Sequence, residues 1–296
     1  MADTLASLVQ LSAANTALVL DSTADLPAAA ERHAGWRTVS AYVTFGDESL
    51  RDYLDLSPAD FYSRLRSSPA QPRTSQPSPG DFEAAFADLA SYERIVCVVL
   101  SEKLSQTGES ARLAAGTVGP DRVLVVDSGV ISGGTVLLAD AIQRRLERGT
   151  TEDEVAALAD RYRREAIFLF TVDTLEYLVR GGRVGRAAGL AGQLLDTKPI
   201  LAIEAGEVVP RARVRGRRKA LAALERLFLE GTRDHADLHV AVSHAEAAEE
   251  AARLADTIRE VRPRAGLDLV TTFGPVIGTH AGPGAVALAW FDDRSG

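Results

Sequence analysis

The chain has 296 residues, of which 46% are hydrophobic and 25% are charged, and its net charge is −8. This length and composition are typical of a globular protein of one large or two smaller domains, and they exclude an intrinsically disordered chain. The acidic balance argues against a general nucleic-acid-binding protein, which carries a basic face or stripe. The single cysteine, Cys97, lies in the apolar run 95–100, which predicts a buried thiol in a reducing, cytoplasmic compartment.

The first fifteen residues lack the basic start and apolar block of a signal peptide, and no stretch approaches the roughly 18 apolar residues of a membrane span. We therefore expect residues 1–15 to form a flexible leader before the first buried strand at 17–20. The expected protein is cytoplasmic and has no membrane span, although transient contact with a membrane surface is compatible with it.

The first half of the chain alternates apolar strands with amphipathic helices. The helix at 81–89 is the best marked, because its apolar residues follow a helical spacing and Ser78 and Pro79 form a helix start. The other elements expected after it are a strand at 94–100, a helix at 105–115, a strand at 123–126 and a helix at 136–148. This alternation predicts a parallel sheet covered on both faces, with ligands bound beyond the carboxyl ends of its strands.

The pattern changes near residue 165. A strand at 166–172 and a short helix through Tyr177 lead to a hairpin around Ala205-Gly206, whose strands are 200–204 and 208–215. The remaining expected elements are a helix at 217–229, a strand at 238–243, a helix at 245–261 and strands at 267–272 and 285–291. We predict an N-terminal α/β domain over 16–164 and a C-terminal α+β domain with a mixed or antiparallel sheet over 165–296.

Two hydroxyl-rich segments, 74–80 and 104–107, each lie where a helix is predicted to begin. Helix N-termini offer free N–H groups and a positive dipole end, so the two segments together suit one bound anion. The glycine-rich segment 278–284 predicts a shaped turn that brings His280 to the same place. The alternatives are that Ser78 and Ser105 only cap helices and that His280 is an ordinary loop histidine.

Two basic features accompany these segments. Arg183, in a Gly-Gly-Arg-Val-Gly turn, either marks a helix end or faces a ligand. Arg211, Arg213 and Arg215 point to one side of the predicted strand 208–215. Such a row is either a solvated face or a surface for a phosphate or an acidic partner, since guanidinium binds oxyanions in pairs of hydrogen bonds.

No nucleotide-binding glycine loop and no metal-binding spacing of His and Cys occurs in the chain. We therefore expect no metal and no cofactor held by this protein.

Considered together, these segments resemble the DegV family, also known as the fatty-acid-binding (FakB) subunits of bacterial fatty acid kinase. The resemblance covers nearly the whole chain. The matching segments, in family order, are 21–27, 73–80, 104–107, 125–128, 178–184, 198–201, 214–220 and 278–284.

The resemblance implies a long-chain fatty acid lying between an N-terminal α/β and a C-terminal α+β domain. Thr74 and Ser105 would bind its carboxylate and His280 would complete the hydrogen-bond network, while Arg183 and Arg215 would face a docked kinase and the incoming phosphate. The protein would then be a carrier and not itself an enzyme: it would present the carboxylate to an ATP-dependent kinase, which forms an acyl phosphate for phospholipid metabolism. Gln106 replaces the glycine common in the family, which would narrow the head-group pocket or add an amide contact.

Two other functions compete with this interpretation. Ser105 as nucleophile and His280 as base would make an acyl hydrolase, but Ser105 lies outside a Gly-x-Ser-x-Gly motif and no acid partner is identifiable. A nucleic-acid-binding or regulatory module built on residues 211–219 is the second alternative, and steeply salt-dependent binding would reveal it.

Overall fold

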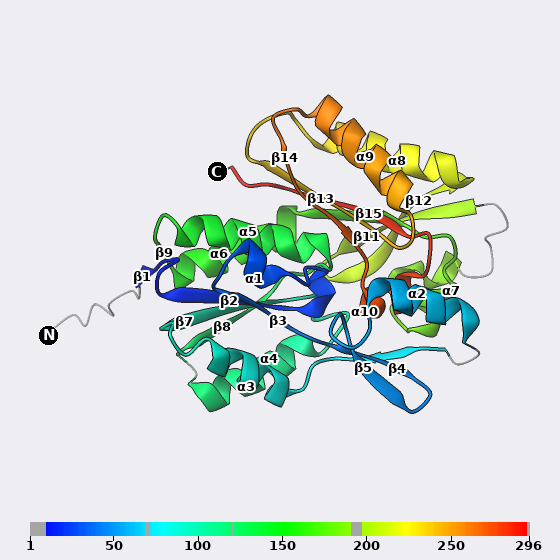
Figure 1. Cartoon of the computed structure of the whole chain (residues 1–296). Coiled ribbons are helices and arrows are strands. Elements are labelled where there is room, and N and C mark those ends of the chain that lie inside the picture. The colour runs from blue at the N-terminus through cyan, green and yellow to red at the C-terminus, as the bar shows by residue number, and fades with distance from the viewer. Residues whose placement is uncertain (1–9, 69–70, 120, 191–196, 295–296) are drawn as a thin grey trace, which may run out of the picture.

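The computed structural model describes residues 10–68, 71–119, 121–190 and 197–294 (Figure 1). Most of the predicted leader therefore lies outside the described residues. Its last part is placed in the fold, because β1 (Gln10–Leu11) pairs with β9 (Thr150–Thr151) and Leu11 is buried.

A four-stranded parallel sheet forms the first layer. Its strands lie in the order β3 (Trp36–Val39), β2 (Thr16–Asp21), β7 (Arg94–Val99) and β8 (Val123–Asp127). The helices α3 (Pro79–Asp88) and α4 (Thr107–Val118) bury an apolar face against one side of this sheet, where Cys97 lies. The parallel sheet predicted from sequence is confirmed.

Local signals explain where α3 begins. Ser78 accepts a hydrogen bond from the backbone N–H of Asp81, and the Asp81 carboxylate accepts one from the N–H of Ser78, a complete capping box with Pro79 at the first helical position.

A six-stranded sheet forms the second layer, in the order β12, β11, β10, β15, β13 and β14. Only β13 and β14 run parallel, so the sheet is mixed, as predicted. The strands are β10 (Ile167–Thr171), β11 (Thr197–Glu204), β12 (Glu207–Arg215), β13 (Leu238–His244), β14 (Gly266–Thr272) and β15 (Val286–Asp292). The β11–β12 hairpin turns at Ala205 and Gly206, both with positive φ, as the sequence predicts.

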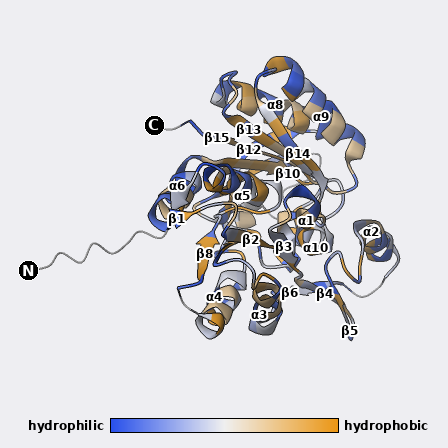
Figure 2. Cartoon of the chain, turned by 60° about the vertical axis from the view of Figure 1, so that its left-hand side comes forward, coloured by the Kyte–Doolittle hydropathy of each residue, from blue (hydrophilic) through white to orange (hydrophobic). Residues whose placement is uncertain are grey.

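Two helices, α8 (Arg217–Gly231) and α9 (Ala248–Val261), cover the outer face of this sheet. In Figure 2 their outward-facing parts are blue, and orange gathers on the strands beneath them. This split between a hydrophilic and an apolar face is typical of helices that cover a sheet in a globular protein.

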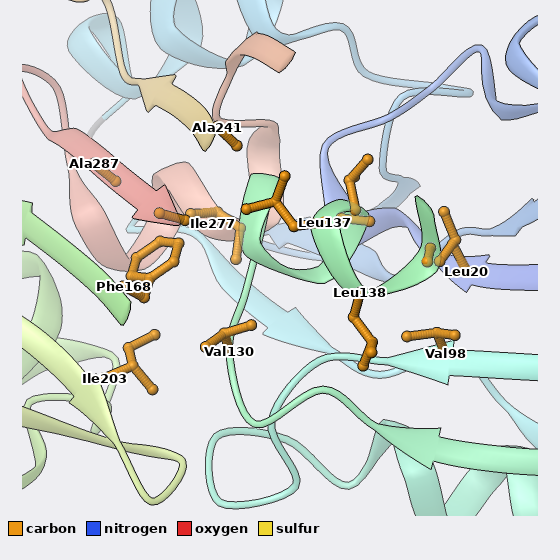
Figure 3. Close-up of a cluster of buried hydrophobic side chains, with 14 of the residues drawn as sticks. Leu20, Val98, Val130, Leu137, Leu138, Phe168, Ile203, Ala241, Ile277 and Ala287 are labelled. Carbon is orange, nitrogen blue, oxygen red and sulfur yellow. The ribbon is translucent and has the colours of Figure 1, made fainter. Parts of the chain in front are cut away.

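The helix α5 (Gly133–Leu146) lies between the two sheets and is buried over most of its length. Figure 3 shows Leu137 and Leu138 of this helix in one cluster with Leu20 and Val98 of the first sheet, and the same cluster includes second-sheet residues such as Phe168. The chain passes to the second sheet after α6 (Glu152–Glu165), a helix that the sequence analysis does not predict. Because the apolar core is shared across residue 165, the division into domains 16–164 and 165–296 stays a prediction.

A third, small antiparallel sheet is also absent from the sequence predictions. It consists of β5 (Glu48–Arg51), β4 (Tyr42–Phe45) and β6 (Arg73–Ser75), and α2 (Pro58–Ser67) follows β5. Thr74 thus lies in an edge strand opposite Val43. The segment 74–80 does open a helix, as predicted, because α3 begins at Pro79 with Ser78 as its cap, but Thr74 itself lies in the strand before that helix.

The segment around His280 also differs from expectation. In place of a glycine turn, residues 275–281 form the helix α10 (Pro275–Ala281), and only Gly282 and Gly284 beyond it have positive φ. Position 278, inside this helix, must be a glycine, because a Cβ there would overlap the side chains of Tyr62 and Phe61.

Short helical elements complete the chain: η1 (Ser22–Ala24), α1 (Ala29–Arg32), α7 (Glu176–Arg180) and η2 (Gly185–Leu190). Within the residues described, no helix is both long and apolar enough to cross a bilayer.

Candidate functional site

A mostly apolar pocket lies between the first sheet, the second sheet and α10. Its apolar lining comes from both halves of the chain: Ala41, Leu100, Leu104, Ile131, Phe168, Phe170, Leu178, Ile203, Val208, Phe273, Val276, Ile277 and Ala281. The polar residues in the lining are fewer: Thr23, Thr74, Ser75, Gln76, Ser105, Thr107, Arg183 and His280. An apolar cavity with a few convergent polar groups is the usual form of a small-molecule site.

The polar side chains gather where the pocket meets a more open hollow on the surface. Gln76, Leu104, Ser105, Arg183 and Val208 line both spaces. We call this shared boundary, together with the adjoining pocket residues Thr74 and His280, the mouth of the pocket. The hollow adds Lys103 and Arg186 as cations and Glu102 and Glu207 as acids, so the surface outside the mouth carries one more positive than negative charge.

Thr74 and His280 form a pair at the mouth although they are 206 residues apart in sequence. Thr74 Oγ1 lies 2.8 Å from His280 Nε2, and His280 Nδ1 is buried without a hydrogen-bond partner among the described residues. Leaving a buried N–H without a partner costs more free energy than leaving a bare ring nitrogen unpaired. We therefore assign the proton of the neutral ring to Nε2, which donates to Thr74 Oγ1, and leave Nδ1 unprotonated. The Thr74 hydroxyl proton is then free to be donated to an anion.

Burial lowers the pKa of His280 to about 4, with a smaller contribution from the positive charge of Arg183. The imidazole is therefore neutral at pH 7. Its ring fits against the backbone of Gly181, where a Cβ would overlap Nδ1. This close approach gives a physical reason for the first of the two glycines before Arg183.

Ser105 also lines the mouth, just before α4. Its Oγ accepts a hydrogen bond from the backbone N–H of Thr107 at 3.3 Å and lies 2.9 Å from Thr107 Oγ1. The N-cap residue of α4 is Gln106 and not Ser105, and the helix begins at Thr107, two residues later than predicted. The side chain of Gln106 lines the hollow outside the mouth and is not part of the pocket lining.

Only one helix N-terminus therefore contributes to this site. The N-terminus of α3 is occupied by its own capping box, which places the Asp81 carboxylate there. The expectation that two helix N-termini grip one anion is wrong, because the hydroxyl of Thr74 reaches the site from a strand.

The two arginines assigned from sequence have different positions. Arg183 lines the mouth, where its guanidinium donates hydrogen bonds to the carbonyl oxygens of Leu104 and Gly181 at 3.2 and 2.7 Å. Arg215 lies at the end of β12, exposed, and is not part of the described lining of the pocket or the hollow. Arg211, Arg213 and Arg215 are exposed alternately with Ala212 and Val214, as the strand pattern predicts.

The geometry argues against the hydrolase alternative. A serine nucleophile needs a base within hydrogen-bond reach. Among the described residues, the hydroxyl of Ser105 pairs with Thr107, and the imidazole of His280 pairs with Thr74. No group of three His, Cys, Asp or Glu residues suited to a metal ion occurs in the part of the chain that the structure describes.

Sequence reasoning missed several residues of the site. Ser75, Gln76 and Thr107 lie inside segments that it singled out, so their hydroxyl and amide groups were the available signal. The apolar lining carried no local signal, because it is assembled from distant elements.

The family model described as "uncharacterised protein, DegV family" matches residues 15–293. The chain belongs to the DegV family. Its relatives include a DegV domain-containing protein of Halalkalibacterium halodurans, 34% identical over 94% of this chain and 99% of the relative. Another is a protein of Thermotoga maritima named fatty acid-binding protein, 34% identical over 92% of this chain and 96% of the relative.

Solved structures of DegV proteins share the fold. A DegV family protein from Thermus thermophilus, described by its fatty acid binding, has a TM-score of 0.86 and 32% identity and covers 94% of this chain and 99% of its own. DegV of Bacillus subtilis, described as a fatty acid binding protein, has a TM-score of 0.83 and 30% identity over 93% of this chain and 98% of its own. These similarities confirm the fold class predicted from sequence.

Proposed function

We propose that this protein binds a long-chain fatty acid, buries the acyl tail in the apolar pocket and holds the carboxylate at the mouth. The observation that carries the proposal is the presence of a half-buried Thr74–His280 pair together with Ser105 and Arg183 at the mouth of a mostly apolar cavity. The DegV relatives described as fatty-acid-binding proteins support the same ligand class.

The energetics favour such a ligand. Each buried methylene contributes about 0.8 kcal/mol, so a long tail binds well even after ordering costs. A carboxylate at the mouth would be costly without hydrogen bonds, and the Thr74 hydroxyl, the Ser105 hydroxyl and the N-terminus of α4 can supply them.

We further propose that the bound carboxylate is presented to an ATP-dependent kinase, which converts it to an acyl phosphate. This chain would then be a carrier subunit and not a catalyst. The hollow outside the mouth supports this role, because Lys103, Arg183 and Arg186 offer cations beside the carboxylate position.

Native mass spectrometry of the protein purified from a bacterial host tests the first part. We expect a bound mass equal to a long-chain fatty acid, and lipid extraction reports its length. Protein that is purified without a ligand and takes up no added oleate would refute the proposal.

The Thr74→Val variant tests the site itself. Removing the hydroxyl leaves the carboxylate short of a donor, which should weaken oleate binding about tenfold. Thr44→Val is the matched control, since the Thr44 hydroxyl on neighbouring β4 faces Ser49 and not the pocket. Equal affinity in both variants would refute the assignment of Thr74.

A further inference from the structure

The start of α10 is held by a cluster of buried acids that the pocket description does not use. Asp25 and Asp52 are each 1% exposed, and both accept hydrogen bonds from the backbone where α10 begins. Asp25 Oδ1 accepts from the Gly274 N–H at 2.8 Å, and Asp52 Oδ1 accepts from the Val276 N–H at 3.4 Å.

Tyrosines from the first half of the chain strengthen this attachment. The Tyr53 hydroxyl lies 2.9 Å from Asp25 Oδ1 and 3.1 Å from the carbonyl oxygen of Thr272. The Tyr62 hydroxyl donates to the carbonyl oxygen of Phe273 at 3.0 Å. Gly274 has no side chain to obstruct this contact, since a Cβ there would overlap the ring of Tyr53.

The segment held in this way is a wall of the pocket. Phe273, Val276 and Ile277 line the pocket, and His280 follows one turn later on the same helix. These apolar side chains are almost fully buried and enclose the pocket on this side, so movement of the wall would widen the path by which a bound tail leaves. The hydrogen bonds of Asp25 and Tyr53 oppose that movement.

The backbone at this place is strained. Asp25 has φ 56° and Tyr53 has φ 64°, values that side-chain-bearing residues rarely adopt. Such conformations persist where the surrounding structure enforces them and gather at functional sites.

Asp25 is only half satisfied as a carboxylate. Its Oδ1 accepts the hydrogen bonds described above, whereas Oδ2 is buried and has no hydrogen-bond partner among the described residues, because the nearby Ser132 hydroxyl donates to Ser243 Oγ at 3.0 Å instead. A buried charge with one unpaired oxygen is unfavourable, and movement of α10 that admits water would relieve it.

We propose that Asp25 is a positioning residue for the pocket: with Tyr53 it clasps the start of α10, and ionisation of its carboxyl group loosens this clasp and speeds release of the bound fatty acid. The release role rests on the proposed function, whereas the clasp itself does not. Burial raises the pKa of Asp25 to about 7, so the group changes charge near neutral pH.

The neighbouring titratable groups do not supply a compensating cation. Those that interact with Asp25 are Asp21, Asp52, Tyr53 and Tyr62, and His244 lies beside Thr272, at the end of the neighbouring strand β14. Burial lowers the pKa of His244, which favours its neutral form. His280 is also neutral between pH 6 and 8, so the mouth keeps its protonation state while Asp25 titrates.

The sign follows from linkage. A raised pKa means that the closed state binds the proton more tightly than a state in which Asp25 meets water, so opening becomes easier as the pH rises toward 7 and above. Between pH 6 and 8 the opening equilibrium should rise by up to about tenfold.

The test is stopped-flow release of fluorescent cis-parinaric acid, chased with excess oleate, at pH 6 and pH 8. Wild-type release should be up to about tenfold faster at pH 8. Asp25→Asn mimics the protonated acid, so its release should be slow and equal at both pH values. Asp47→Asn, an exposed aspartate in the β4–β5 turn, is the matched control and should behave as wild type.

Tyr53→Phe removes one hydrogen bond and keeps Asp25. Release from this variant should be about fivefold faster than from wild type, with the pH dependence retained. A wild-type pH dependence that persists in Asp25→Asn, or release from Tyr53→Phe at the wild-type rate, would overturn the proposal.

Hydrogen exchange of the α10 amides in ligand-free protein separates the clasp from the ligand. After correction for the intrinsic pH effect, exchange in Asp25→Asn at pH 8 should be slower than in wild type. Unchanged exchange would overturn the clasp. If exchange is slower as expected but the protein binds no fatty acid, the clasp stands, whereas the proposed function and the release role are both overturned.

Discussion

The two ends of α10 differ in how their polar groups are satisfied. At its start, backbone N–H and C=O groups bond to Asp25, Asp52 and Tyr62, all supplied by the protein. Near its end, His280 has one partner, Thr74, and one ring nitrogen with none among the described residues. One short helix thus joins an end whose polar groups are paired within the protein to an end with an unpaired ring nitrogen, and the proposed carboxylate site lies at this second end.

The largest expected effect is at the anchoring end. Because burial raises the pKa of Asp25 from 3.8 to about 7, folding takes up a proton between these values, and this group's contribution to stability falls as the pH rises from about 4 to about 7. At pH 8, Asp25→Asn should raise the free energy of unfolding by up to about 4 kcal/mol. Urea denaturation at pH 5 and pH 8 measures this, and an Asp25→Asn protein less stable than wild type at pH 8 would contradict it.

A smaller effect is expected at the ligand end. In Gly181→Ala the new methyl group would displace the ring of His280 and separate it from Thr74, while the backbone there has an ordinary helical conformation. Oleate affinity, measured by titration calorimetry, should fall at least about tenfold.

The matched control is Gly116→Ala in α4, where a Cβ meets nothing within 4 Å. That variant should keep its affinity and gain slightly in stability, because alanine favours a helix over glycine by about 1 kcal/mol. Normal affinity in Gly181→Ala would mean that the Thr74–His280 pair is not needed.

The smallest effect on binding is expected outside the pocket. Arg215→Ala should leave oleate affinity unchanged, because Arg215 does not line the pocket. It should lower acyl phosphate formation severalfold when a cell extract depleted of this protein, with ATP and Mg²⁺, is supplemented with the variant. Trapping the product with hydroxylamine measures the reaction, and loss of oleate uptake in this variant would show that the role given to Arg215 is wrong.

Sequence analysis correctly predicted the elements whose start or turn depends on a few adjacent residues. The capping box of α3 and the Ala205-Gly206 turn are examples, since each depends on a few adjacent residues. The helix α10 and the strand β6 escaped prediction because one contains an internal glycine required by Tyr62 and the other has only three residues.

Several of the polar residues of the candidate site were predicted from sequence, whereas the buried acids beside it were not. Resemblance to the DegV family pointed to Thr74, Ser105, His280 and Arg183, which the structure brings to one mouth, and to Arg215, which it does not. The loop 21–25 was placed beyond a strand end and matched the family, but the burial of its acids was not predictable, because a loop aspartate is normally exposed and only the packed fold reveals that Asp25 is buried.

The position of α5 has a consequence for anyone who divides this protein. Its apolar side chains serve both sheets, so a fragment that stops at residue 164 would carry this helix with one face uncovered, and a fragment that starts at residue 165 would lack the helix that seals its inner face. Both pieces would expose contiguous apolar surface and aggregate. A reporter or affinity tag should therefore be fused to one end of the intact chain.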